Sequence, residues 1–276
     1  MKKINYSLIV SDFDGTLVNN DRTIVPSNKD AIKEYITNGG KFAISTGRLP
    51  AGIIARAEEL ELKGVVSCCQ GSVIVDIESR EVLLKGTISH EVTLQVCEKL
   101  ESMGVHYHVY DLWDFYSNID DEPLKMYERM TGSKGIILKD KTLPEFVRET
   151  KMEAYKFLVM VAPEDNAKIF KILEAENFEG CTITKSGAVL VEIINKNYSK
   201  GTAIEFLSKY YNIPIEKIVG IGDQWNDIPM IETAGLGIAV KNADELLKKA
   251  ADVTFDYTNE EGAVGKIIEK YGYSEE

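Results

Sequence analysis

The chain has few cysteines, and their spacing indicates no cysteine-based framework. Four cysteines occur among 276 residues, none in a C-x-x-C pair, and two of them, Cys68 and Cys69, are neighbours. Neighbouring cysteines rarely bond to each other, and the other spacings do not suit zinc. We therefore expect buried thiols in a reducing compartment rather than a disulfide-stabilised secreted fold.

Long apolar runs and an excess of positive charge are absent as well. The apolar stretch behind Met1 is interrupted at Asn5 and Ser7 and ends at Asp12, so we expect neither a signal peptide nor a membrane span. With 32 Lys and Arg against 44 Asp and Glu, the formal charge is −12. Such a surface repels polyanions, which argues against a nucleic-acid partner. Small anionic substrates stay compatible with it where a metal or a local cation neutralises their charge. We expect a cytoplasmic protein with no membrane partner, and the sequence does not indicate its oligomeric state.

Apolar runs of strand length alternate with amphipathic helices at both ends of the chain. In the first part, this alternation predicts strands at 8–10, 42–45 and 65–69 and helices at 27–38 and about 51–62. In the last part, it predicts strands at 218–221, 236–240 and 253–255 and helices at 227–234, 243–250 and from a capping box at 258–261 to about 271. Such alternation is typical of a parallel sheet with helices on its faces.

The middle of the chain has a different pattern. Two helices are expected among strands that look antiparallel, and one hairpin carries a glycine turn. The helices lie at about 89–103 and 166–175, and the hairpin has strands at 181–184 and 189–194 around a turn at 185–187. Helices and antiparallel strands arranged in this way form an α+β unit.

Together these patterns predict an α/β fold with an insertion. A Rossmann-like parallel-sheet core, residues 1–85 and 196–276, is expected to carry an inserted α+β cap domain, residues 86–195. Aromatic residues at 107–116 are more typical of the core of the inserted sheet than of a substrate platform. Two histidines in the same stretch lack a third ligand and are a weak indication of a metal. We therefore place no residue of the insertion in the site.

Polar residues directly follow three of the predicted core strands. Asp12, Thr46 and Asp223 each occupy such a position. Ligands of open parallel sheets bind outside the carboxyl ends of the strands, where helix N-termini converge. Each residue alone fits a turn or a helix cap, but three at the same edge of the sheet favour a ligand site.

Asp12 and Asp14 form a pair of carboxylates at the end of a buried strand. Side chains alternate along a strand, so the two acids are expected to point the same way and to share a small volume. Such a pair is stable when a cation lies between the acids or when one carboxyl keeps its proton. Asp-Gly is also a common turn dipeptide, so the pair alone fits a surface turn equally well. Asp223, Asn226 and Asp227 offer three further oxygen ligands, which suits Mg²⁺.

Four short polar runs occur in a fixed order along the predicted core. They are DFDGTL at 12–17, STGR at 45–48, KG at 200–201 and GDQWND at 222–227. This set resembles the motifs of the haloacid dehalogenase superfamily, and the long insertion between the second and third runs is similar to the α+β cap of its Cof-type branch, subfamily IIB. One position departs from that branch, because Gln70-Gly71-Ser72 stands where Asn-Gly-Ala is common.

The resemblance implies a Mg²⁺-dependent phosphatase that hydrolyses small phosphorylated metabolites, such as sugar phosphates or cofactor precursors. It implies that Asp12 attacks phosphorus and forms an aspartyl-phosphate, which divides one difficult hydrolysis into two easier steps. Asp14 would protonate the leaving alcohol and then activate water, and its presence favours phosphoryl chemistry because a halide leaves without a proton. Mg²⁺ would be held by Asp12, Asp223 and the backbone carbonyl of Asp14.

The other motif residues take supporting roles by the same resemblance. Thr46, Gly47 and Lys200 would bind the oxygens of the transferring phosphoryl group. Asn226 and Asp227 would support the metal and the lysine.

Several alternatives stay open. Arg48 could contact the substrate or pair with a carboxylate of the core. A phosphomutase shares these motifs and would require a hexose bisphosphate without net release of phosphate. A non-catalytic protein that binds a phosphorylated metabolite is a third alternative, although residues for nucleophile, acid/base and metal are all present. The substrate itself does not follow from fold-level analogy.

Overall fold

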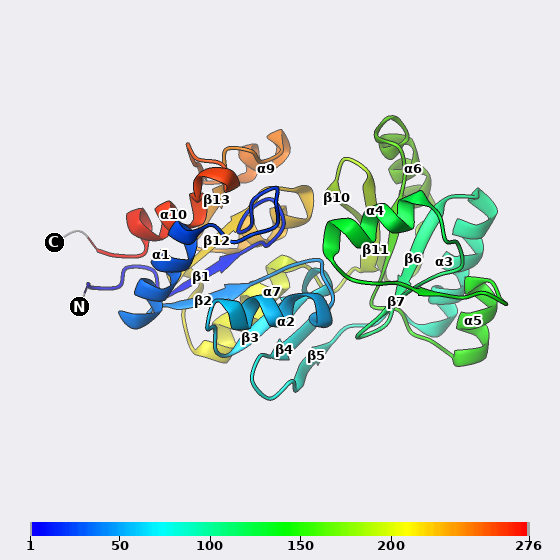
Figure 1. Cartoon of the computed structure of the whole chain (residues 1–276), viewed down its shortest axis with the longest axis horizontal. Helices are drawn as coiled ribbons and strands as arrows, with labels where there is room; N and C mark the ends of the chain where they lie inside the picture. The colour runs from blue at the N-terminus through cyan, green and yellow to red at the C-terminus, as the bar shows by residue number, and fades with distance from the viewer. Residues whose placement is uncertain (1, 275–276) are drawn as a thin grey trace.

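The central sheet is parallel and is built from both ends of the chain (Figure 1). The structure, a computed structural model, describes residues 2–274. The sheet has the order β14-β13-β12-β1-β2. Its strands are β1 (Leu8–Ser11), β2 (Lys41–Ile44), β12 (Ile218–Gly222), β13 (Leu236–Ala239) and β14 (Val253–Thr254). Leu8 lies opposite Lys41 on one side and Ile218 on the other. The chain leaves β1 in one direction toward β2 and returns on its other side at β12, and ligands of open α/β sheets bind at such a reversal.

Helices cover both faces of this sheet, as predicted. They are α1 (Pro26–Thr37), α2 (Pro50–Glu59), α7 (Lys200–Tyr211), α8 (Ile228–Thr233), α9 (Glu245–Ala250) and α10 (Ala263–Tyr271). Ile9 of β1 packs in the apolar cluster that contains α1 and α10, whereas Leu8 and Val10 pack in the cluster that contains α7 and α8. The buried strand therefore separates two apolar layers.

The start of α7 is fixed by a capping box. The Ser199 hydroxyl accepts from the backbone N–H groups of Gly201 and Thr202, and the Thr202 hydroxyl accepts from the Ser199 N–H. Gly201 has no room for a side chain, because a Cβ there would lie 2.5 Å from the carbonyl oxygen of Pro229 on α8. The cap and this close approach together place Lys200 at the first position of the helix, beside the end of β12.

A smaller sheet beside the parallel one differs from the prediction. Residues 65–69 are predicted as a strand of the parallel sheet, but β3 (Val65–Cys68) pairs antiparallel with β4 (Val73–Asp76), which pairs with β5 (Val82–Lys85). An isolated parallel bridge between Ser45 and Ser67 and a 2.9 Å bond from the Thr46 N–H to the Ser67 carbonyl oxygen join it to the chain just after β2.

A tight turn explains this reversal. Cys69, Gln70 and Gly71 have positive φ angles of 48°, 60° and 91°, so the backbone turns back immediately after β3. The first two of these residues are not glycines and give no turn signal in the sequence.

The inserted segment forms a sheet of its own, with the order β10-β11-β9-β6-β7-β8. Its strands are β6 (His106–Tyr110), β7 (Phe115–Ser117), β8 (Ile136–Ile137), β9 (Lys156–Met160), β10 (Cys181–Gly187) and β11 (Leu190–Asn195), and its helices are α3 (His90–Met103), α4 (Glu122–Thr131), α5 (Leu143–Thr150) and α6 (Pro163–Glu176). One face of the sheet packs on α3, α5 and α6, and the other packs on α4 and the core. We call residues 86–195 the cap, and its boundaries stay a prediction.

Two details of the cap differ from the sequence-based expectation. The turn of the hairpin lies at 188–189 rather than 185–187, because β10 continues through Gly187, which pairs with Leu190 after a shift in register. The helices α4 and α5 were not expected, although the sequence carries helix signals there: both have a proline in the first turn, and α5 begins with a capping box of Thr142 and Glu145. No helix within residues 2–274 is long and apolar enough to cross a bilayer.

His106 and His108 form a buried pair on the face of the cap sheet that is turned toward the core. Their Nε2 atoms are 2.8 Å apart, and His106 Nδ1 lies 2.9 Å from the Asp121 carboxylate. The His108 ring lies among aromatic rings, 4.7 Å from Phe115 and 5.0 Å from Tyr127. Burial lowers the pKa of both imidazoles, and it lowers that of His108 well below its ordinary value. The charge of Asp121 opposes this shift at His106.

This pair predicts a loss of stability in acid. The unfolded chain takes up protons on both histidines as the pH falls through about 6.5, whereas the folded chain resists them. The free energy of unfolding should therefore decrease below pH 6.5, and His108→Phe should reduce its slope by about 1.4 kcal/mol per pH unit. Urea unfolding between pH 5 and 7.5 measures both slopes. Tyr127→Phe, in the same aromatic cluster, should keep the wild-type slope; equal slopes for His108→Phe and the wild type would contradict the prediction.

Candidate active site

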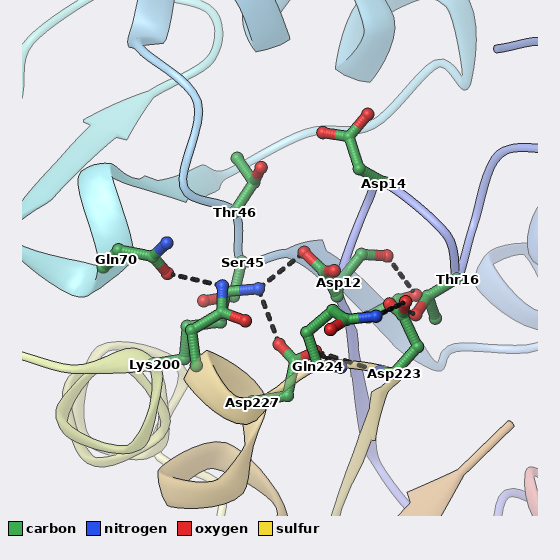
Figure 2. A network of polar contacts seen from close by, with 12 residues as sticks. Asp12, Asp14, Thr16, Ser45, Thr46, Gln70, Lys200, Asp223, Gln224 and Asp227 are labelled. Atoms are coloured by element: carbon green, nitrogen blue, oxygen red, sulfur yellow. Dashed lines mark hydrogen bonds and ion pairs between the residues drawn. The ribbon is translucent and has the colours of Figure 1, made fainter. Parts of the chain in front are cut away.

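A buried lysine connects the predicted site residues (Figure 2). Lys200 Nζ donates to Asp12 Oδ1 and to Asp227 Oδ1, each at 2.6 Å, and the lysine side chain is 0% exposed. Asp12 follows β1, Asp227 follows β12 and Lys200 begins α7, so one ammonium links three elements. Burial lowers the pKa of Lys200, but the two carboxylates raise it further, and the net pKa lies above its ordinary value. The lysine is therefore charged.

Asp223 lies next to this ion pair at the end of β12. Its Oδ1 accepts a 2.7 Å hydrogen bond from the Thr16 hydroxyl, and its Oδ2 accepts a 3.2 Å bond from the Gln224 amide. Burial, followed by the charge of Asp227, raises the pKa of Asp223 to about 7. Burial and the neighbouring acids also raise the pKa of Asp12 well above its ordinary value, although Lys200 opposes this. The positive charge near Asp12 and Asp223 is therefore too small to stabilise both of them as carboxylates.

The carboxylates form a suitable set of ligands for a divalent cation. Asp12, Asp223 and Asp227 each place one carboxylate oxygen within 4.8 Å of the others. Three carboxylates against the ammonium of Lys200 leave a charge of −2 in a buried place, which Mg²⁺ would neutralise. Asp227 accepts from three donors, because Lys200 bonds to its Oδ1 and the N–H groups of Asp223 and Gln224 bond to its Oδ2, the latter two at 2.9 Å. Asp12 and Asp223 each accept from fewer donors. Asp12 and Asp223 are therefore the better candidate ligands, and Asp227 braces the lysine and the loop.

Asp14 lines one cavity with Asp12, but the two side chains do not point the same way, contrary to the strand pattern. Figure 2 shows its carboxylate directed away from that of Asp12. Both Asp14 oxygens accept from Arg48, at 2.6 and 2.7 Å, and a third donor of Arg48 bonds to the carbonyl oxygen of Thr131 in the cap at 2.8 Å. The backbone turns after Phe13, which ends the alternation of side chains on which the prediction depends. Of the two roles considered for Arg48, the structure shows the pairing with a core carboxylate.

Thr46 and Gly47 line a cavity between core and cap. Its volume is about 120 Å³, and Asp12, Asp14 and Arg48 also face it. A Cβ on Gly47 would lie 2.5 Å from the Gln70 amide nitrogen, so any larger residue here would displace the Gln70 side chain. The structure thus brings the predicted acids and the Thr46-Gly47 backbone together around one space.

Several further residues that were not predicted for the site line this cavity. Among them are Gln70 of the core and Tyr127, Lys156 and Glu192 of the cap. Glu192 interrupts an apolar run, and Lys156 opens another, so charge on otherwise buried strands was the available signal. Tyr127 lies on the unexpected helix α4 and had no such signal.

The sequence of motifs and this geometry agree with a known family. Residues 9–268 match the haloacid dehalogenase-like hydrolases, and the chain belongs to this family. The fold is accordingly the expected α/β core with an inserted cap.

Individual relatives support the same assignment. The chain is 28% identical to a Bacillus subtilis 5-amino-6-(5-phospho-D-ribitylamino)uracil phosphatase, YwtE, over 95% of this chain and 96% of the relative. It is 27% identical to the B. subtilis phosphatase YwpJ, over 95% and 98%. A solved haloacid dehalogenase-like hydrolase from B. subtilis is 26% identical and superimposes with a TM-score of 0.85, over 95% of this chain and 99% of that one.

The lysine-centred network predicts a large effect of one isosteric change. Asp227→Asn keeps the volume but removes one of the two charges that hold Lys200. The new amide nitrogen faces either the Lys200 ammonium or the N–H groups of Asp223 and Gln224. A buried donor without a partner costs about 1–3 kcal/mol, so we expect a loss of this size in the free energy of unfolding, measured with urea. Glu61→Gln breaks the exposed Lys33–Glu61 pair instead and should change stability little. Similar values for the two variants would contradict the role given to Asp227.

Proposed function

We propose that the chain is a Mg²⁺-dependent phosphatase that hydrolyses small phosphorylated metabolites through an aspartyl-phosphate on Asp12. One observation carries the proposal: Asp12 faces the cavity with one oxygen held by Lys200, while its Oδ2 accepts no hydrogen bond from the residues that the structure describes. A fixed carboxylate with a free oxygen is suited to attack. The similarity to named phosphatases, one of them named for a phosphorylated ribitylaminouracil, supports this reaction class.

The backbone and the lysine would stabilise the charge of the transferring group. Thr46 and Gly47 border the cavity beside Asp12, and they are placed to contact phosphoryl oxygens. Lys200 acts mainly on Asp12 in the geometry described here, because both of its contacts are carboxylates. Holding the nucleophile in one orientation lowers the entropic cost of the attack.

The metal would be held by Asp12, Asp223 and the carbonyl oxygen of Asp14, with Asn226 and Asp227 in support. Mg²⁺ in this position supplies charge neutralisation, which allows an anionic nucleophile to approach an anionic phosphate. Asp227 holds the loop by accepting the N–H groups of Asp223 and Gln224.

Asp14 would serve as the general acid and then as the general base. In the structure its carboxylate is 49% exposed and paired with Arg48. We infer that substrate entry moves Asp14 away from Arg48 and toward the leaving oxygen, where it passes a proton taken from solvent to the leaving alkoxide and later recovers one from the attacking water.

The nucleophile makes the first test. Asp12→Asn should lower turnover by at least about three orders of magnitude, because the amide cannot form the covalent intermediate. Release of inorganic phosphate from a panel of phosphorylated metabolites, with and without Mg²⁺, measures this. Asp21→Asn, an exposed acid of the same segment, is the control. Retained activity in Asp12→Asn would refute the mechanism, and isomerisation of a hexose phosphate without phosphate release would indicate a mutase.

Metal binding makes a second test, which does not depend on turnover. Since the pKa of Asp223 is raised to about 7, Mg²⁺ must displace a proton below that pH. The increase in unfolding temperature with Mg²⁺ should therefore be larger at pH 8 than at pH 6. Asp223→Asn should lose most of the increase and its pH dependence. An increase of equal size at both pH values would contradict the assignment of Asp223 as a ligand.

A further inference from the structure

A chain of hydrogen bonds crosses from the cap sheet to the loop that follows β12. Lys156 Nζ donates to Glu192 Oε2 at 2.9 Å, the Gln70 amide donates to Glu192 Oε1 at 3.0 Å, and the Asn226 amide donates to the Gln70 oxygen at 3.0 Å. All four side chains are buried. We call these four residues the relay.

On the cap side, the relay is held rigidly. Lys156 and Glu192 lie on the paired strands β9 and β11, and each is only 2% exposed. The lysine also lies over the ring of Tyr110, 4.6 Å from its centroid. A buried carboxylate cannot leave such a partner without a large penalty, so Glu192 moves only when the cap sheet moves.

On the core side, the relay is also held in a defined position. Gln70 belongs to the turn with positive φ angles, and its amide lies against Gly47. A Cβ on Gly47 would be 2.5 Å from Gln70 Nε2 and 3.6 Å from Glu192 Oε1, which places the Glu192 carboxylate beside the backbone that borders Asp12. The other end of Gln70 holds Asn226, whose neighbour Asp227 braces Lys200.

We propose that Glu192 is a positioning residue of the active site, which acts through Gln70 on Asn226 and so couples closure of the cap to the geometry of the loop 223–227. This inference rests on the proposed phosphatase function. Glu192 accepts a hydrogen bond from Gln70 across the boundary between cap and core. Gln70 is uncharged, so this contact leaves the ion pair between Glu192 and Lys156 in place. When the cap moves away, Gln70 loses its acceptor Glu192 and is no longer held in one orientation, so its contact with Asn226 and the position of the loop are free to shift.

Gln70→Glu tests the inference. It keeps the oxygen that accepts from Asn226 but sets a second carboxylate against Glu192, so closure becomes unfavourable. We expect a decrease in kcat of about tenfold to a hundredfold, the size that a small misplacement produces. The factor should be similar for p-nitrophenyl phosphate, glycerol 3-phosphate and glucose 6-phosphate, since a positioning residue does not contact the leaving group. Gln95→Glu, the same change at an exposed glutamine of α3, should leave kcat unchanged.

A spectroscopic measurement separates this inference from the proposed function. Trp225 of the core lies 6.1 Å from the Phe170 ring and 4.6 Å from the Lys185 ammonium, both of the cap. In a Trp113→Phe background, its fluorescence reports closure whether or not phosphate is released. We expect Gln70→Glu, and also the uncharged Gln70→Leu, to shift the emission to longer wavelength while both keep the wild-type far-UV circular dichroism.

The outcomes are distinct. No phosphate release from wild type, together with the emission shift in the variants, would refute the phosphatase and leave the closure contact supported. A decrease that differs strongly between the three phosphoesters would overturn the inference, because Glu192 or Gln70 would then contact the leaving group. Unchanged emission and unchanged kcat in both variants would overturn it as well.

Discussion

The ammonium of Lys200 is the contact on which the rest of the site depends. It lies between Asp12 and Asp227 with no exposure to solvent, in a place where like charges would otherwise repel one another. Its position follows from local structure, because Ser199 caps α7 and Gly201 lets the helix touch α8. The strand β1, the helix α7 and the loop after β12 therefore fix one another through one charged group.

The cap completes this site rather than only covering it. Arg48 connects Asp14 to a carbonyl of α4, and Gln70 connects Asn226 to β11, so polar contacts to the cap lie at both ends of the cavity. A cavity of about 120 Å³ is smaller than the roughly 150 Å³ that holds benzene. A phosphoester with a sizeable leaving group must therefore displace the cap, and specificity and access involve the same movement.

Much of this arrangement could be read from the sequence, because its causes are local. Apolar periodicity shows where the strands end, and the geometry of parallel sheets places these ends at one edge. The residues that follow them, Asp12, Thr46 and Asp223, are brought together in the structure. The orientation of Asp14 could not be read, since it depends on a turn after Phe13 and on Arg48, which is distant in the chain. The pairing of Lys156 with Glu192 likewise depends on the register of two cap strands.

The order of the strands along the chain also determines when the site forms during folding. In β1, Leu8 pairs with Ile218, about three quarters of the chain away, whereas the cap sheet uses only residues between 106 and 195. Contacts of such sequence separation form slowly, and segments with nearer partners gain their stability first. During synthesis β1 can pair early with β2, but it emerges long before its other neighbour β12, so its edge toward β12 stays unpaired until most of the protein has left the ribosome. The cap can assemble in that interval, and the acidic centre is the last part to form.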